Sequence, residues 1–305
     1  DLVNDLNTSL IKLLSDPNIA SKSYVYNQYD STVRTNTVLG PGSDSAVIRI
    51  KNTSKGLSVS TDCNGRYVYI NPRQGAMMAV AEAARNVVCT GAKPLAITNC
   101  LNFGNPQDPE IYWQFKEAVL GIGDMCRILD TPVTGGNVSF YNESVASAVY
   151  PTPVIGMVGL IEDVSKFMTM DFKNEGDLIV TIGDINPSLG GSTYLKHFYG
   201  KVEGPLSNFN TVAEVNVQNL CLELIGNKII NSAHDVSDGG LGVSMAESVI
   251  FSKDNIGADI NLEHKLRQDE LLFGECSSLI VVSLNESKLY DLVHLSKKYD
   301  VRTQT

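Results

Sequence analysis

The sequence has neither paired cysteines nor a long apolar run, and both absences exclude classes of protein. Its six cysteines are spread singly with no C-x-x-C pair. This favours free thiols in a reducing cytoplasm over disulfide or metal roles, which are the alternative. No apolar run approaches the roughly 20 residues that span a bilayer, and no signal-peptide pattern opens the chain. We therefore expect a cytoplasmic protein without membrane contact.

Positive charge is also scarce. Lys and Arg number 24 against 34 Asp and Glu, which gives a net charge of −10. Nothing resembles a basic patch, so non-specific nucleic-acid binding is excluded. Neither G-x-G-x-x-G nor G-x-x-x-x-G-K-[ST] occurs, so neither of these phosphate loops is available. A phosphorylated ligand would have to be held by backbone N–H groups and magnesium.

Helical periodicity and short apolar runs alternate along the 305 residues, a length that allows two domains. Hydrophobic residues make up 43 % and charged residues 19 %, as in globular proteins. The predicted helices cover residues 1–14, 75–89, 109–129, 194–198, 212–225, 242–251 and 286–299. The predicted strands cover residues 46–50, 56–61, 66–70, 94–100, 153–160, 177–183, 229–233 and 278–284.

This alternation predicts an α/β (α+β) fold class with two domains, each a mixed β-sheet with packed helices. The composition turns polar at residues 161–166, which places the domains at 1–165, including a helix and connector over 1–39, and at 166–305. The chain begins without a methionine and stops soon after the last predicted helix, where another strand would be usual. We therefore expect a piece of a longer polypeptide whose second domain is truncated at its end.

Residues 131–143 carry a Gly-Gly pair followed by a row of polar side chains. Pro132 and Val133 are predicted to end a short strand, and Gly135-Gly136 would let the backbone turn or approach a ligand closely. The polar residues after the pair are Asn137, Ser139, Asn142 and Glu143. Such groups suit a phosphate-bearing ligand with its metal ion. A polar hairpin loop without a ligand is the alternative.

Two pairs of acidic or amide residues are further candidates. Glu82 and Asn86 are the polar exceptions in an apolar helical run, and their i, i+4 spacing puts both on one helix face. They could bind one ion, or Glu82 could be satisfied by Arg85 or the backbone. Asp44 and Asp62 lie at strand ends beside turns, where carboxylates serve as turn caps or as metal ligands.

Residues 234–241 lead from a predicted strand into a predicted helix through His-Asp-Val-Ser-Asp-Gly-Gly-Leu. This arrangement gathers side chains and N–H groups at a helix N-terminus, where anions bind. Capping by Ser237 or Asp238 would explain only part of the pattern. Residues 271–276 are predicted to form a turn.

Five segments together closely resemble the phosphoribosylformylglycinamidine synthase family, in the superfamily of aminoimidazole ribonucleotide synthetase. They cover residues 71–86, 97–106, 134–143, 150–159 and 233–241. The resemblance runs over nearly the whole chain and matches the C-terminal half of the family's synthetase subunit. It implies a PurM-like two-domain unit, with two tandem copies in the subunit and the catalytic cleft between them.

The resemblance implies a C–N bond-forming ligase of purine biosynthesis. The family converts formylglycinamide ribonucleotide, ATP, glutamine and water to formylglycinamidine ribonucleotide, ADP, phosphate and glutamate. ATP with Mg²⁺ activates the formamide oxygen by phosphorylation, and ammonia from a glutaminase partner displaces it. These implied cofactors agree with the need for magnesium and backbone donors around phosphate.

Motif positions carry the family's ligand contacts onto this chain. The resemblance implies that Asn99 and Gly136 contact ATP, that Asn137 binds magnesium, and that Ser139 contacts the ribonucleotide substrate. The family usually has an aspartate at the position of Asn99, which keeps an acceptor oxygen but lacks the charge.

A second, auxiliary nucleotide site of long-chain relatives is also implied. Its metal ligands would be Asp44, Glu82, Asn86 and Asp235, with Ser237 touching the nucleotide. Smaller bacterial enzymes can leave that site unfilled. For His234 we expect a structural or auxiliary-site role.

The family's catalytic histidine and Gly-rich phosphate loop belong to the N-terminal half, and neither pattern occurs here. We therefore expect no catalytic residue in this chain and no turnover by the chain alone. The implied partners are the N-terminal half of the same subunit, a glutaminase subunit or domain and a small bridging subunit. A homodimer of this chain could replace the missing half.

Two other functions are weighed against the enzyme half. One is a non-catalytic scaffold half that binds a structural nucleotide and partner subunits. The other is a stand-alone relative such as a selenophosphate or hydrogenase-maturation enzyme. The latter is disfavoured because no reactive Cys or Lys lies in an N-terminal Gly-rich segment.

Overall fold

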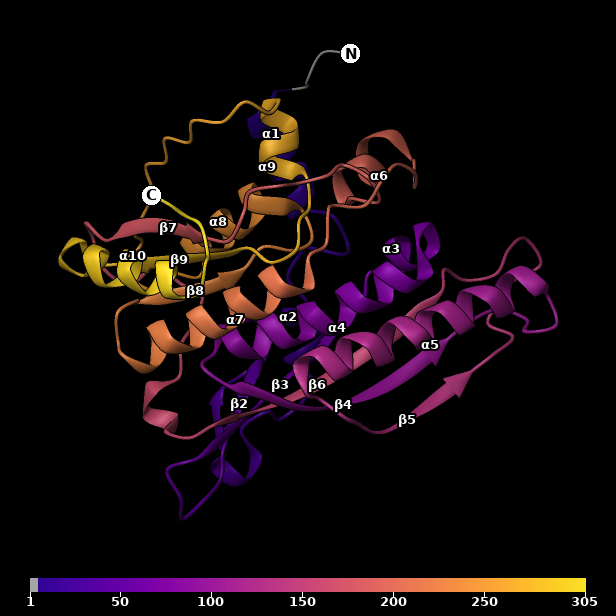
Figure 1. Cartoon of the computed structure of the whole chain (residues 1–305), viewed down its shortest axis with the longest axis horizontal. Helices are drawn as coiled ribbons and strands as arrows, with labels where there is room; N and C mark the ends of the chain where they lie inside the picture. The colour runs from indigo at the N-terminus through magenta and orange to yellow at the C-terminus, as the bar shows by residue number, and fades with distance from the viewer. Residues whose placement is uncertain (1–4) are drawn as a thin grey trace.

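Strands from the first half of the chain form a six-stranded sheet in the computed structural model, which describes residues 5–305 (Figure 1). The spatial order is β1-β2-β3-β6-β4-β5. The strands are β1 (Thr37–Leu39), β2 (Ala46–Arg49), β3 (Gly56–Asp62), β4 (Lys93–Asn102), β5 (Val133–Ser139) and β6 (Thr152–Ile161). β4 and β5 pair in parallel and the other neighbours are antiparallel, so this sheet is mixed as predicted.

The second half forms a four-stranded sheet in the order β10-β7-β9-β8. Its strands are β7 (Leu178–Ile182), β8 (Ser232–Asp235), β9 (Ile280–Leu284) and β10 (Thr303–Gln304). All pairings described for this sheet are antiparallel, so it differs in this detail from the mixed sheet that we expected. The short strand β10 is the additional strand that the sequence pattern missed. The predicted fold class, two sheets with packed helices, is confirmed.

Helix α4 (Pro72–Cys89) lies between the two sheets, and this position explains its apolar composition. Asn71 caps its start by accepting a hydrogen bond from the Gln74 N–H at 3.1 Å, and Pro72 occupies the first turn. One side of α4 packs on the first sheet, and the other meets α7 (Thr211–Gly226) and β8. From Gly75 onward most of the helix is buried, so small apolar residues occur on nearly all of its faces. The predicted buried helix is confirmed.

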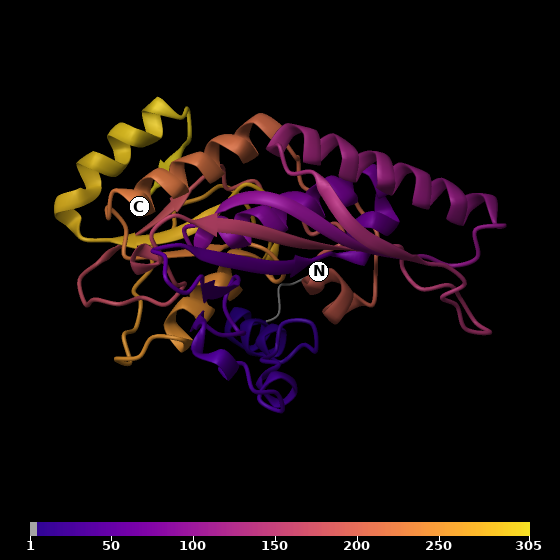
Figure 2. The same ribbon diagram turned by 90° about the horizontal axis from the view of Figure 1, so that it is seen from below.

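Helix α5 (Pro109–Leu129) packs beside α4, and its predicted bounds agree with the structure. Figure 2 shows α10 (Leu289–Lys298), α7 and α5 following one another along one side of the molecule. The remaining α-helices are α1 (Leu6–Leu14), α2 (Ser23–Tyr26), α3 (Gly65–Ile70), α6 (Thr193–Tyr199), α8 (Gly240–Ile250) and α9 (Gln268–Phe273). The prediction of a helix over 1–14 is confirmed from residue 6, and residues 1–4 lie outside the described residues.

The local predictions for residues 66–70 and 271–276 are wrong. Residues 66–70 form helix α3 rather than a strand, because Asn64 caps the segment by accepting from the Arg66 N–H at 3.1 Å. The apolar run of residues 67–70 is too short to distinguish a helix from a strand by its period alone. In the segment predicted as a turn, Leu271–Phe273 instead end helix α9, and the chain leaves it at Gly274.

All six cysteines are free, and four of them are buried: Cys89, Cys126, Cys221 and Cys276. Within residues 5–305, the helices are too short or too polar to cross a membrane.

Candidate functional site

The Gly-Gly segment predicted as a turn lies inside β5, the edge strand of the first sheet. Val133 therefore begins this strand instead of ending one. β5 runs parallel to β4, with Asn99 opposite Gly136, Cys100 opposite Asn137 and Asn102 opposite Ser139. The resemblance-based ligand residues of β4 and β5 are thus brought together at one sheet edge.

Gly136 lies too close to β4 for any side chain. A Cβ at this position would be 2.2 Å from the Asn99 Oδ1 and 2.5 Å from the Asn99 carbonyl oxygen, and the φ angle of Gly136 is +154°. The Asn99 side chain therefore covers the Gly136 backbone. This contact explains why the position is glycine and pairs the two predicted ATP-contacting residues.

Asn137 and Ser139 follow on β5. Asn137 is exposed, and the two-residue period of a strand puts its side chain on the same face as that of Ser139. Ser139 is half-buried because Asn142 folds back on it, donating Nδ2 to the Ser139 carbonyl oxygen at 2.8 Å and to the Phe103 carbonyl oxygen at 3.1 Å. The edge thus presents one free amide beside one oriented hydroxyl.

The predicted auxiliary ligands gather at a second place, between the two sheets. The Asp235 N–H donates to Asp44 Oδ1 at 3.0 Å, and Asn86 Nδ2 donates to Asp62 Oδ1 at 3.0 Å. Burial raises the pKa of Glu82 well above its ordinary value, and the nearby Asp62 and Asp235 raise it further. We call Asp44, Asp62, Glu82, Asn86 and Asp235 the acidic cluster.

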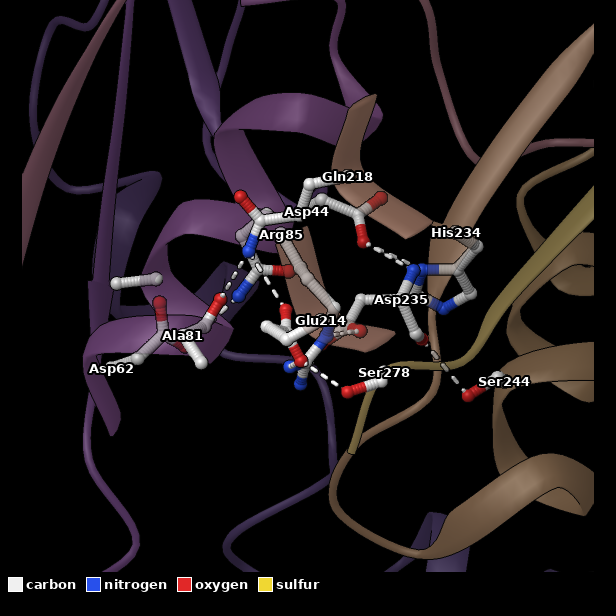
Figure 3. A network of polar contacts seen from close by, with 12 residues as sticks. Asp44, Asp62, Ala81, Arg85, Glu214, Gln218, His234, Asp235, Ser244 and Ser278 are labelled. Atoms are coloured by element: carbon white, nitrogen blue, oxygen red, sulfur yellow. Dashed lines mark hydrogen bonds and ion pairs between the residues drawn. The ribbon is translucent and has the colours of Figure 1, made fainter. Parts of the chain in front are cut away.

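A buried arginine reaches this cluster from α4 (Figure 3). Arg85 donates Nε to Asp235 Oδ1 at 2.6 Å and a second guanidinium nitrogen to Glu214 Oε2 at 2.8 Å. Both carboxylates, together with Arg85, are almost fully buried. Asp235 and Glu214 raise the pKa of Arg85 although burial opposes its charge. Arg85 therefore carries a permanent positive charge into the cluster.

His234 supplies a second positive charge. Its Nδ1 lies 2.8 Å from Asp44 Oδ1 and its Nε2 lies 3.0 Å from Glu247 Oε2. Burial opposes the charged ring, but the two carboxylates raise the pKa of His234 well above its ordinary value. A protonated His234 donates to both. The structural or auxiliary-site role that we expected for His234 stays a prediction, and its contact with Asp44 joins it to the predicted auxiliary ligands.

The acidic cluster fits magnesium in its chemistry but not in its arrangement. Carboxylate and amide oxygens suit Mg²⁺, and one oxygen each of Asp44 and Asp62 is buried without a hydrogen-bond partner. However, no three His, Cys, Asp or Glu side chains in residues 5–305 are placed to hold a metal ion together. Asp235 is engaged by Arg85. The chemistry of the cluster suits a metal, but its arrangement does not.

At the start of α8 we expected a bound anion, but the carboxyl group of Glu275 occupies this position. The Gly239 N–H donates to Glu275 Oε1 at 2.8 Å, as does the Thr193 N–H at the start of α6. The Tyr67 hydroxyl donates to the other Glu275 oxygen. Ser237, the predicted nucleotide contact in this loop, is half-buried, and Asp238 is held by Asn64 Nδ2 at 2.9 Å.

Glu275→Gln should flatten the pH dependence of stability between about pH 5 and 7. Burial and the nearby Asp238 raise the pKa of Glu275 to about 7, against the opposing charge of Arg66. The folded state then binds more protons than the unfolded state, so stability is lost as pH rises through this range, by at most about 3 kcal/mol. Thermal unfolding at several pH values measures the slope. An unchanged slope in Glu275→Gln would contradict the assignment.

Family models match both halves of the chain. "AIR synthase related protein, N-terminal domain" matches residues 42–161, and "AIR synthase related protein, C-terminal domain" matches residues 174–304. The chain belongs to the AIR synthase related protein family. Two curated relatives are named "Phosphoribosylformylglycinamidine synthase subunit PurL". The chain is 50 % identical over 285 residues to that of Alkaliphilus metalliredigens (strain QYMF) and 49 % identical over 298 residues to that of Moorella thermoacetica (strain ATCC 39073 / JCM 9320).

These alignments cover 93 % and 98 % of this chain but only 38 % and 40 % of the length of the two relatives. The fold matches "T. maritima PurL complexed with FGAR" with a TM-score of 0.75 at 16 % identity, over 99 % of this chain and 49 % of that one. "T. maritima PurL complexed with ATP" gives 0.73 at 17 % identity, over 99 % and 47 %. "Structure of PurLQS from Thermotoga maritima" gives 0.68 at 18 % identity, over 85 % and 41 %. The resemblance recognised in the sequence is confirmed.

Sequence reasoning missed the groups that balance charge in the interior. The sequence pattern offers Arg85 only as a partner of Glu82, whereas Arg85 binds Asp235 and Glu214. Glu214 and Glu275 were not singled out. The available signal was an arginine inside an otherwise apolar helix, since a buried guanidinium must be paired.

Proposed function

We propose that this chain is the C-terminal half of a phosphoribosylformylglycinamidine synthase subunit. The complete enzyme would convert formylglycinamide ribonucleotide and glutamine-derived ammonia to formylglycinamidine ribonucleotide at the expense of ATP, in the cytoplasm. Asn99 and Gly136 would contact ATP, Asn137 would bind Mg²⁺ and Ser139 would bind the ribonucleotide. The related T. maritima PurL structures, which are complexes with FGAR and with ATP, support the proposed substrate and nucleotide.

One observation supports the proposal: Asn99 on β4 lies opposite Gly136 on the edge strand β5, and Asn137 and Ser139 follow Gly136 on the same strand. The lack of a side chain at Gly136 lets Asn99 pack directly against its backbone, which brings the two predicted ATP-contacting residues together. Asn137 is a neutral ligand, so Mg²⁺ would come with the phosphates and be held mainly by them. Bound magnesium would supply charge neutralisation at the phosphoryl group, while Ser139 orients the substrate.

The uncovered face of the first sheet supports the N-terminal half of the same subunit as partner. Ser58 and Ser60 point to α4, where Ser60 Oγ donates to the Ala83 carbonyl oxygen at 2.8 Å. The alternate residues Ile48 and Val59 therefore face away from α4, and both are exposed. An apolar sheet face needs a cover. The relatives are more than twice as long as the aligned region, which leaves chain length for a second unit. A glutaminase and a small bridging subunit would complete the assembly.

Asn137→Ala should lower kcat about 100-fold, and Ser139→Ala should raise KM for the ribonucleotide about 10-fold. The assay uses the complete subunit with ATP, formylglycinamide ribonucleotide and an ammonium salt, which removes the need for the glutaminase. Val138→Ala is the matched control, because this exposed residue lies between the two sites. Wild-type kinetics in both site variants would favour a non-catalytic scaffold half. Product formed by residues 1–305 alone would contradict a cleft shared with the other half.

A further inference from the structure

The predicted auxiliary site would bind a magnesium nucleotide, which brings one positive and one negative charge. In this chain, side chains already occupy the places of both charges. A magnesium nucleotide places a cation among carboxylates and an anion on a helix N-terminus. In this chain a guanidinium already lies on the carboxylates, and a carboxylate already lies on the N–H groups. We infer that Arg85 and Glu275 replace the metal and the phosphate from within the chain, so that this region is a closed ion network that binds no magnesium nucleotide.

The cation side of the network is saturated by Arg85. Its Nε and one terminal nitrogen approach the two oxygens of Asp235 at 2.6 Å and 3.4 Å, and its other terminal nitrogen binds Glu214. Glu214 also accepts from Ser278 Oγ at 2.6 Å and from Gln218 Nε2 at 2.7 Å. A metal ion would therefore have to displace a bidentate guanidinium from Asp235 in a buried site, which is costly.

The anion side is saturated by Glu275, which follows α9 and binds the Gly239 N–H, four residues after Asp235. Its Oε1 accepts from both Gly239 and Thr193, the starting N–H groups of two helices. A phosphate would have to displace this buried carboxyl group from the two N–H donors that it already occupies. Arg85 thus binds one end of the 235–239 segment, at Asp235, and Glu275 binds the other end, at Gly239.

These internal charges also connect the two halves of the chain. Arg85 on α4 reaches β8 and α7, and Tyr67 on α3 reaches Glu275 beyond α9. A bound ligand is thus not needed to hold the sheets together. The observation that could favour a cation instead is the pair of buried, unpartnered oxygens on Asp44 and Asp62, and the experiment is designed to include them.

The test follows thermal unfolding with and without millimolar Mg²⁺ alone. Wild-type Tm should not respond to Mg²⁺. Arg85→Met should lower Tm by roughly 10 °C, because Asp235 and Glu214 lose their cation, and Mg²⁺ should restore part of the loss. Adding Asp235→Asn to Arg85→Met should abolish that restoration. A wild-type Tm that rises with Mg²⁺, with the rise lost in Asp235→Asn or Asp62→Asn, would overturn the inference, as would a wild-type Tm in Arg85→Met.

A second measurement decides the question if Arg85→Met does not fold. Titration of the wild-type protein with Mn²⁺, followed by electron paramagnetic resonance, should show no ion whose binding depends on the acidic cluster. Bound Mn²⁺ that is lost in Asp235→Asn but kept in the edge-strand variant Asn137→Ala would place a metal in the cluster and refute the closed network. The inference does not depend on the proposed function, because Asn137 and Ser139 belong to the other site.

Discussion

Glu214→Ala is expected to destabilise the protein by about 3–5 kcal/mol, one of the largest losses available to a single substitution in this chain. The side chain is fully buried and accepts hydrogen bonds from Arg85, Ser278 and Gln218. Removing it leaves three buried donors without their common acceptor and leaves Arg85 with a single counter-ion. The energetic cost comes mostly from the groups that remain, since an unpaired buried charge keeps its desolvation penalty.

The same helix provides the matched control for this prediction. Glu223 on α7 also forms an ion pair, with Lys298 Nζ at 2.7 Å, but this pair lies at the surface. Glu223→Ala should therefore change stability by less than about 1 kcal/mol. Thermal and chemical unfolding of both variants, followed by circular dichroism, gives the comparison. Equal losses in the two variants would show that burial of the Glu214 pair contributes nothing.

Most of the fold could be predicted because the long elements carry strong periodic patterns. Helix α5 was predicted with the correct bounds since Pro109 and an apolar stripe mark it clearly. The errors lie in short segments. Residues 67–70 are a short run of aromatic and β-branched residues typical of a strand, yet the Asn64 cap and the contacts of Arg66 with Gly191 and Thr193 across the chain accompany a helix. Tertiary contacts of this kind have no local signal.

The residues of β4 and β5 could be predicted from the sequence more completely than the acidic cluster. The residues of β4 and β5 were recognised by motif, although the Gly-Gly pair is not a turn but a close approach of two strands. The acidic cluster was recognised through its carboxylates, while its cations were not. Charge pairing between α4, α7 and β8 joins residues more than a hundred positions apart, as in Arg85 with Glu214 and Asp235, and a single sequence cannot show such pairs.

Gly136→Ala is expected to lower the activity of the complete subunit by about 100-fold or more while the chain still folds. The new methyl group would meet both the side chain and the carbonyl oxygen of Asn99. The side chain could rotate away, but the carbonyl belongs to the strand backbone, so β5 would have to move from β4. Because β5 is an edge strand, this movement would displace Asn137 and Ser139 without disrupting the core.

Gly135→Ala is the control, because it also replaces a glycine of β5 but leaves the contact between Gly136 and Asn99 intact. Nothing lies within 4 Å of a Cβ at Gly135, and its backbone has no left-handed φ, so the neighbouring variant should keep activity within about twofold of wild type. Steady-state kinetics with ATP and ribonucleotide varied in turn should show kcat falling in Gly136→Ala alone. Full activity in Gly136→Ala would mean that the close approach of Asn99 and Gly136 does not position the ligands. The proposal that β4 and β5 bind the nucleotide in a cleft shared with the other half would then be contradicted.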